Sequence, residues 1–158
     1  MSEPQFWIDH FGLQRHPEGG YFAEFYRSSQ TVETARGPRP AGTSIYFLLE
    51  QGDFSAFHRL QSDELWHFYW GSALTLWVIE PSGQLATLRL GADPAQGQSL
   101  QALVPKNTWF AAQPDGCALV GCTMAPGFDY ADFELAERAE LSRLYPQHAE
   151  LIGRFTRD

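Results

Sequence analysis

The chain has 158 residues, of which 44% are hydrophobic and 15% aromatic, so it can bury the core of one ordinary domain over residues 1–158. Eleven basic and nineteen acidic side chains give a formal net charge of −8, which disfavours a nucleic acid polymer or an anionic membrane as partner. Glu3 and Pro4 stand where a targeting signal would have basic and apolar residues, so we expect a soluble, cytoplasmic protein.

The first part of the chain predicts a short helix and then a strand. Apolar residues recur at helical spacing from Pro4 to about Leu13, which predicts a helix. A proline and a glycine pair within His16 to Gly20 predict a turn, and a strand is expected from Tyr21 to Ser28. Glycines and prolines from Val32 to Gly42 indicate a surface loop.

From residue 44 the pattern changes to short strands separated by turn residues, and it ends in helices. Eight strands are predicted: Ser44 to Leu49, Phe54 to Leu60, Glu64 to Trp70, Leu74 to Ile79, Leu85 to Leu90, Leu100 to Val104, Trp109 to Gln113 and Ala118 to Met124. Their regular spacing predicts an antiparallel sandwich or barrel. Two closing helices are predicted, from Asp132 to Leu144 and from Pro146 to Phe155.

Four residues in the middle of the chain follow a known spacing. Gly52, His58, Glu64 and Gly71 match the first cupin motif, in which two histidines and a glutamate hold a metal inside a small β-barrel. The position of the second histidine is Leu60, so one ligand of this motif differs.

The second cupin motif is altered as well. It normally contains a proline, a glycine and a histidine at fixed spacing, and here Pro105, Asn107 and Phe110 occupy those places. The last metal histidine is therefore replaced by Phe110.

More specifically, the chain resembles cupin family five, an uncharacterised group similar in barrel type to the deoxythymidine-diphosphate-sugar epimerases. The fragments that carry the resemblance are His16 to Phe22, Tyr26 to Ser28, Thr43 to Leu49, Phe54 to Arg59, Ser62 to Tyr69 and Val120 to Asp129. The resemblance implies an all-β fold, the cupin double-stranded β-helix or jelly roll, with short flanking helices at both termini. It also implies a homodimer and a pocket inside the barrel, but no particular reaction.

The residues left at the metal positions favour a barrel without metal or other cofactor. Of four ligands only His58 and Glu64 remain, whereas a catalytic divalent ion usually takes three protein ligands. If a metal were bound, His67 would be the third ligand. His67 follows Glu64 by three residues, however, so on a regular strand it faces the other side of the sheet.

Without metal, His58 and Glu64 predict acid–base chemistry. The sequence suggests His58 as general base, Glu64 as the group that fixes its tautomer, and the hydroxyl of Tyr46 or Tyr69 as the donor that returns the proton. The alternative is that His58 and Glu64 satisfy each other in a barrel that only binds. The resemblance favours the first reading, since epimerases of this barrel type use a histidine without metal.

Seven further residues are candidates for ligand contact: Arg27, Tyr26, Ser44, His67, Trp66, Trp109 and Phe110. Arg27 could hold a phosphate or carboxylate, or form an ion pair with Glu24 or Asp63. The tryptophans are either core residues or a stacking face, and His67 is either structural or a ligand contact. His16 could hold its own turn or contact the ligand.

Three functions remain open from the sequence. The first is an isomerase, epimerase or lyase that acts on a polar metabolite, such as a sugar or a nucleotide-sugar, with His58 as base. The second is a module that binds or senses a small molecule without turning it over. The third is a metal-dependent cupin enzyme that uses His58, Glu64 and a nonstandard ligand.

Overall fold

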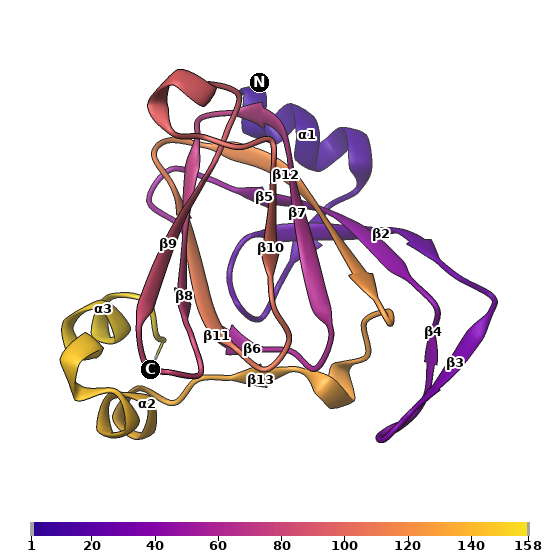
Figure 1. Cartoon of the computed structure of the whole chain (residues 1–158). Coiled ribbons are helices and arrows are strands. Elements are labelled where there is room, and N and C mark those ends of the chain that lie inside the picture. The colour runs from indigo at the N-terminus through magenta and orange to yellow at the C-terminus, as the bar shows by residue number, and fades with distance from the viewer. Residues whose placement is uncertain (1, 158) are drawn as a thin grey trace.

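The computed structural model describes residues 2–157 and consists of two antiparallel sheets that face each other, with helices at both ends of the chain (Figure 1). The six-stranded sheet has the order β1-β2-β5-β12-β7-β10, and the five-stranded sheet has the order β13-β6-β11-β8-β9. Strands β3 and β4 form a separate hairpin. This is the jelly-roll arrangement predicted from the sequence.

The strands of the six-stranded sheet are β1 (Gln14–Arg15), β2 (Tyr21–Arg27), β5 (Thr43–Leu49), β7 (Asp63–Gly71), β10 (Gln101–Val104) and β12 (Ala118–Ala125). Those of the five-stranded sheet are β6 (Ser55–Arg59), β8 (Leu74–Ile79), β9 (Leu85–Leu90), β11 (Trp109–Pro114) and β13 (Glu134–Leu135). All the predicted strands are present, each end lying at the predicted residue or one residue away, and β1 and β13 are additions to these two sheets.

Strand alternation puts one face of each sheet into a shared core. Along β7, Glu64 and Trp66 are buried while Leu65 and Tyr69 are exposed on the other face. The core between the sheets contains aromatic and aliphatic side chains from both layers, among them Phe47, Trp66, Leu76, Phe110 and Val120. The alternation therefore decides which side chains reach the interior of the barrel.

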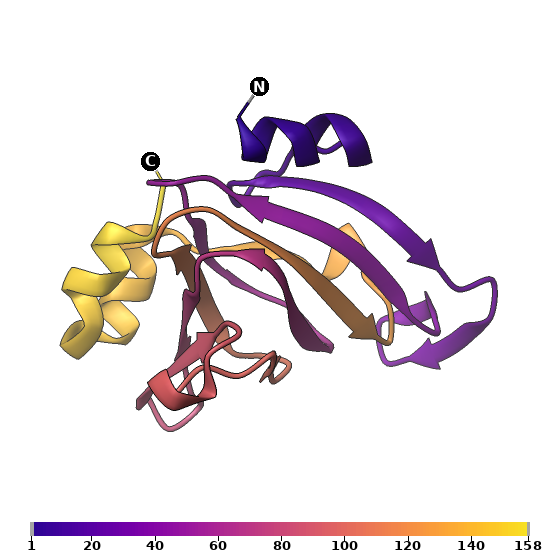
Figure 2. The same cartoon turned by 90° about the horizontal axis from the view of Figure 1, so that it is seen from above.

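Helices cover two outer surfaces of the barrel. Helix α1 (Glu3–Phe11), capped by the Ser2 side chain, lies on the outer face of the six-stranded sheet (Figure 2). Its Phe11 ring stacks on Tyr46 of β5, with ring centroids 4.1 Å apart. Helices α2 (Arg138–Leu144) and α3 (Ala149–Arg154) pack through Leu141 and Ile152 against the outer face of the other sheet. The core of the barrel thus stays between the sheets.

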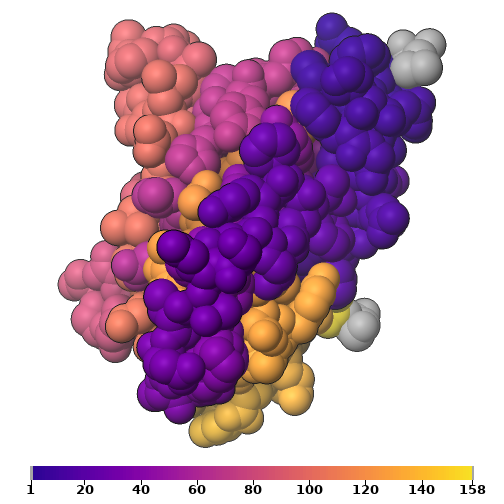
Figure 3. Space-filling model, turned by 90° about the vertical axis from the view of Figure 1, so that its right-hand side faces the viewer, coloured from indigo at the N-terminus to yellow at the C-terminus, as the bar shows by residue number. Residues whose placement is uncertain are grey.

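The loop predicted from Val32 to Gly42 is wrong, because this segment forms the hairpin of β3 (Thr31–Thr34) and β4 (Gly37–Pro40). Gly37 supplies the turn with a φ of +105°, a region that favours glycine. Val32 pairs with Arg39, whose guanidinium reaches Asp132 at 2.8 Å. Figure 3 shows the hairpin (purple) beside the segment that follows β12 (orange).

The first closing helix begins later than the sequence predicts. Asp132 ends a 3-10 turn that starts at Tyr130, and Glu134–Leu135 then pairs with β6, so α2 starts only at Arg138. The ion pairs of Asp132 with Arg36 and Arg39 take up the carboxylate that was expected to start a helix. Another 3-10 turn, Pro146–His148, precedes α3, and a further one, Pro94–Gln96, lies between β9 and β10.

Among residues 2–157, no helix is both long and apolar enough to cross a membrane.

Candidate functional site

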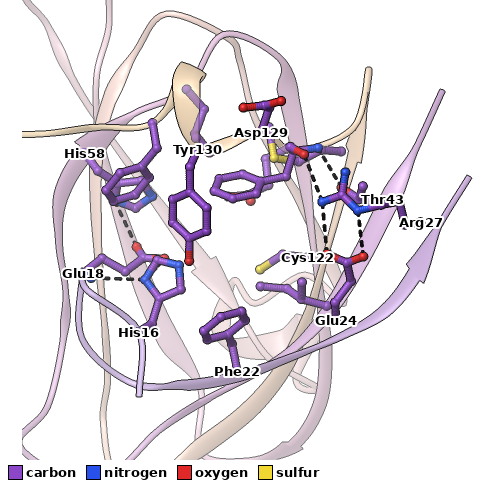
Figure 4. Close-up of a pocket in the computed structure, with 16 residues that line it drawn as sticks. His16, Glu18, Phe22, Glu24, Arg27, Thr43, His58, Cys122, Asp129 and Tyr130 are labelled. Atoms are coloured by element: carbon purple, nitrogen blue, oxygen red, sulfur yellow. Dashed lines mark hydrogen bonds and ion pairs between the residues drawn. The ribbon is translucent and has the colours of Figure 1, made fainter. Parts of the chain in front are cut away.

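A cavity of about 310 Å³ opens between the two sheets at one end of the barrel (Figure 4). Its walls combine apolar side chains with ionisable ones. The lining residues are His16, Glu18, Phe22, Glu24, Arg27, Thr43, Ile45, His58, Leu60, Glu64, Cys122, Met124, Phe128, Asp129, Tyr130 and Phe133. Of the predicted site residues, the structure brings His58, Glu64 and Arg27 together here.

The turn before β2 contributes two cavity residues, His16 and Glu18. Gly19 has a φ of +111°, and a Cβ atom at this position would lie 2.0 Å from the carbonyl oxygen of Phe54. Only glycine allows this close approach, which presses the turn against β6. The backbone carbonyl of Glu18 accepts a hydrogen bond from Ala56 at 2.8 Å, so the Glu18 side chain enters the barrel.

His58 is held by two acceptors at the same ring nitrogen. Its Nδ1 lies 2.7 Å from the carbonyl oxygen of Ala56 and 3.1 Å from Oε2 of Glu18, which also accepts a hydrogen bond from the Ser55 hydroxyl. We therefore assign the ring proton to Nδ1. Within residues 2–157 no hydrogen bond reaches Nε2, so its lone pair is left for a ligand.

His16 has the opposite tautomer. The backbone amide of Glu18 donates to Nδ1 of His16 at 3.1 Å, which places the ring proton of the neutral imidazole on Nε2. The Glu18 carboxyl lies between the two rings, with Oε1 at 3.4 Å from His16 Nδ1 (Figure 4). The cavity thus contains two different imidazoles: Nε2 of His58 can accept a proton, and Nε2–H of His16 can donate a hydrogen bond.

Burial shifts the pKa values of four cavity groups, His16, Glu18, His58 and Glu64, in the direction that favours their uncharged forms. Loss of solvent lowers the pKa of His58 to about 4 and also lowers the pKa of His16. It raises the pKa of Glu18 and, together with the nearby Glu18 charge, raises the pKa of Glu64 to about 8. At neutral pH His58 is a neutral base and Glu64 is a protonated acid.

Glu64 has a different partner from the predicted one. Trp66 donates its Nε1–H to Oε1 of Glu64 at 2.7 Å. The group beside Nδ1 of His58 is Glu18, so the prediction that Glu64 fixes the His58 tautomer is wrong. With Oε1 used as an acceptor, we assign the proton of the neutral carboxyl to Oε2. Glu64 can therefore act as a hydrogen-bond donor in the cavity.

Arg27 stands at the mouth of the cavity and is already paired. Its Nε and Nη2 donate to the two carboxylate oxygens of Glu24 at 2.8 and 3.1 Å, and Nη2 also donates to the carbonyl oxygen of Phe128 at 3.1 Å. Of the two ion pairs considered for Arg27, the structure has the one with Glu24. The contact with Phe128 ties the segment after β12 to the cavity rim.

Five predicted site residues lie on the outer face of the six-stranded sheet instead. Strand alternation turns Tyr46 and Tyr69 away from His58, and the two rings face each other outside the barrel with centroids 5.9 Å apart. Neither tyrosine can return a proton to a ligand in the cavity. Ser44 and Tyr26 are paired neighbours on that same face, and His67 contacts Thr123 Oγ1 there at 3.1 Å.

The three other residues that were candidates for ligand contact, Trp66, Trp109 and Phe110, are core residues. Trp66 is 1% exposed and its role is to bind Glu64. Phe110, also 1% exposed, packs against the His58 ring, with the two ring centroids 4.1 Å apart. Trp109 packs with Leu141 and Ile152 of the C-terminal helices, and Arg59 covers its ring. None of the three lines the cavity.

The residues at the cupin metal positions do not fit a metal ion. Leu60 and Phe110 have hydrocarbon side chains without a lone pair, and His67 points to the other face of β7. Within residues 2–157 no group of three or more His, Cys, Asp and Glu side chains could hold a metal. His58 and Glu64 instead have protein partners, Ala56 and Trp66.

The jelly roll with an internal cavity and the motif spacing around His58 define a cupin-type β-barrel. The family described as Cupin superfamily (DUF985) matches residues 5–136, and the chain belongs to it. The chain is 29% identical over 154 residues to the Uncharacterized protein YML079W of Saccharomyces cerevisiae, covering 84% of this chain and 76% of the yeast protein.

Two solved structures show the same fold over nearly the full length. Protein SO0799 from Shewanella oneidensis is 40% identical, with a TM-score of 0.92 and 99% of each chain covered. A hypothetical protein from Leishmania major is 37% identical, with a TM-score of 0.92 and 98% of each chain covered. These similarities support the fold and the family and carry no particular reaction.

Proposed function

We propose that the cavity catalyses proton transfer at a carbon atom beside a carbonyl group, as an isomerase or epimerase of a small polar metabolite. The observation that carries this proposal is the pairing of a neutral base with a neutral acid in one cavity. His58 has a free lone pair at Nε2, and Glu64 is a carboxylic acid whose pKa is raised to about 8 by burial. Groups whose pKa values are pushed apart in this way are typical of acid–base sites.

The chemistry needs no oxidant or co-reactant. Nε2 of His58 removes the carbon-bound proton, the electron pair forms a carbon–carbon double bond, and the carbonyl oxygen becomes an enol oxygen that receives the Glu64 proton. When protonated His58 returns the proton to the opposite face of the same carbon and the enol proton goes back to Glu64, the product is an epimer. When that carbon carries a hydroxyl group, protonated His58 can instead deliver the proton to the former carbonyl carbon while the hydroxyl proton passes to Glu64, and the product is an isomer. A buried carboxylic acid is a strong donor for such an oxygen, because no water competes for its hydrogen bond.

The binding-only function remains the alternative, and one observation favours it. Every fully buried side-chain nitrogen and oxygen among the described residues has a hydrogen-bond partner, so the His58–Glu18 network is stable without a substrate. A barrel that only binds would use the same walls. The two functions differ in whether a bound compound exchanges its carbon-bound hydrogens.

Solvent exchange tests the proposed function directly. The protein is incubated in deuterated water with aldoses and ketoses of three to six carbons, and deuterium at carbon is followed by NMR and mass spectrometry. We expect His58→Asn to lower the exchange rate by about 10²- to 10⁴-fold. Tyr69→Phe is the matched control, because its hydroxyl lies outside the barrel. A compound that binds without exchange, or equal exchange in His58→Asn, would reject the base.

A further inference from the structure

We propose that the ligand of this cavity is an uncharged hydroxy-carbonyl compound no larger than a monosaccharide, and that the cavity rejects phosphorylated and carboxylated forms of the same compound. The inference rests on the proposed function for the carbonyl group. It replaces the nucleotide-sugar considered from the sequence with a smaller and uncharged class of ligand. The charges and the volume of the cavity carry it.

The cavity walls contain more acidic than basic groups. Four carboxyl groups line the cavity, Glu18, Glu24, Glu64 and Asp129, against the single guanidinium of Arg27. A negatively charged ligand would approach the Asp129 carboxylate at the mouth, and like charges in a poorly solvated site repel strongly. Deeper in the cavity the ligand would lose solvent beside neutral groups such as His58 and protonated Glu64, with no cation among the described lining residues there to pair with its charge. The wall therefore disfavours an anion at every depth.

Arg27 does not offset this balance, because Glu24 already occupies its guanidinium. Two parallel hydrogen bonds join the side chains at 2.8 and 3.1 Å, which is the geometry that a phosphate or carboxylate ligand would need. A further hydrogen bond from Nη2 to the Phe128 carbonyl oxygen fixes the guanidinium at the rim. An anionic ligand would have to displace a carboxylate of this chain from Arg27.

The interior suits hydroxyl and carbonyl groups. His58 Nε2 can accept a hydrogen bond, while protonated Glu64 and Nε2–H of His16 can donate one. These three groups are uncharged at neutral pH, so an uncharged ligand pairs with them without leaving a buried charge unpaired. Apolar side chains such as Ile45 and Leu60 fill the wall between them.

The volume sets the size of the ligand. A cavity of about 310 Å³ lies at the lower end of the range of about 300–1,000 Å³ that small-molecule sites occupy. A pentose or hexose fits this space, whereas a nucleoside diphosphate-sugar would extend far beyond the mouth. At the mouth it would meet Asp129 and exposed Tyr130, and the guanidinium there, Arg27, is already paired with Glu24.

Binding measurements with matched pairs test the selectivity without turnover. Dissociation constants are measured by ligand-observed NMR and thermal shift for aldoses and ketoses of three to six carbons. Each sugar is compared with its phosphate ester and its sugar acid. We expect at least one unmodified sugar to bind, and its anionic forms to bind roughly tenfold more weakly or worse.

The variant Glu24→Gln supplies a gain-of-binding test. It frees Arg27, so we expect the ratio of the sugar phosphate Kd to the sugar Kd to fall by roughly tenfold. The double variant Glu24→Gln with Arg27→Met should lose that gain, and Glu33→Gln on the exposed hairpin is the matched control.

Two outcomes would overturn the selectivity: an anionic form that binds wild-type protein as tightly as its parent sugar, or a panel in which no unmodified sugar binds at about 10 mM. A sugar that binds selectively but exchanges no carbon-bound hydrogen supports the selectivity and rejects the proposed proton transfer. The two proposals therefore fail separately.

Discussion

Oε2 of Glu18 lies 3.1 Å from Nδ1 of His58, although Glu18 belongs to the turn before β2 and His58 to β6 of the opposite sheet. This contact joins the two layers of the barrel at the cavity. It also makes the orientation of the proposed base depend on the glycine turn that delivers Glu18. Glu18 is therefore a positioning residue for His58.

Glu18→Gln should disturb the His58 tautomer more than the fold. The amide keeps the shape of the carboxylate, but its NH₂ group can donate to a histidine nitrogen, so Nδ1–H is no longer favoured at this contact. We expect long-range ¹H–¹⁵N NMR spectra to show pure Nδ1–H in the wild type and a mixture in the variant. Where a substrate is found, kcat should fall about tenfold with little change in KM.

Ser55→Ala provides the comparison for Glu18→Gln. It removes only the hydroxyl that donates to Glu18 and leaves the carboxylate beside His58. The tautomer should therefore stay Nδ1–H in this variant. An unchanged His58 spectrum in Glu18→Gln would show that the Ala56 carbonyl alone fixes the ring.

The buried acid Glu64 should make the stability of the protein fall as the pH rises. Burial raises the pKa of Glu64 from 4.5 in the unfolded chain to about 8 in the folded protein. Between these pH values the unfolded chain loses a proton that the folded chain keeps, so unfolding becomes more favourable. Glu64→Gln is neutral at every pH. Its free energy of unfolding, relative to the wild type, should rise by about 2–4 kcal/mol from pH 5 to pH 8.

Urea unfolding at several pH values measures this difference. His58 works in the opposite direction, because its folded pKa of about 4 lies below the ordinary value of 6.5 and its contribution is lost as the pH falls between them. Both proteins contain His58, so its effect cancels when they are compared. Glu33→Gln, on the exposed hairpin, should follow the wild type. A constant difference between Glu64→Gln and wild type would contradict the raised pKa.

Part of this site could be predicted from the sequence because it depends on local spacing. The cupin spacing identified His58 and Glu64, and the alternation of a regular strand placed His67 on the outer face. The same alternation excludes Tyr69, which is five residues from Glu64 and therefore faces the other side of β7, although its hydroxyl has the chemistry to return a proton.

The contribution of Glu18 could not be predicted in the same way. It depends on a contact between the two sheets, and the only local signal was the glycine pair in His16 to Gly20, which indicates a tight turn but not what the turn approaches. The hairpin of β3 and β4 could not be predicted from the sequence for a related reason. Its prolines and glycines are turn residues by composition, and the Arg39–Asp132 pair that anchors it joins distant parts of the chain.

The ion pair between Asp132 and Arg39 should stabilise the segment at the cavity mouth, residues 127–133. Asp132 binds Arg39 through both oxygens at 2.8 and 2.9 Å, and the two side chains are only 5% and 8% exposed. Asp132→Asn leaves the Arg39 charge buried without its partner, so we expect a loss of about 3 kcal/mol in the free energy of unfolding. Hydrogen exchange should increase at residues 127–133 and in the hairpin.

Asp115→Asn is the matched control for this loss. Asp115 also pairs with an arginine, Arg89, but its side chain is 56% exposed, so the change should cost less than about 1 kcal/mol. Equal losses in the two variants would show that burial adds nothing to the Asp132 pair.

We propose that two copies of the chain pair through the part of the outer face of the six-stranded sheet that helix α1 leaves exposed. Phe25 is 72% exposed at the irregularity of β2, Tyr69 is 53% exposed on β7, and Leu103 is 49% exposed on β10, so apolar groups extend across this face. Exposed apolar surface of this kind often marks a protein interface. Sedimentation at about 100 μM should show a dimer for the wild type and a monomer for Phe25→Ser with Tyr69→Ser. Val32→Ser, on the hairpin, should remain dimeric, and a monomeric wild type would refute the assignment.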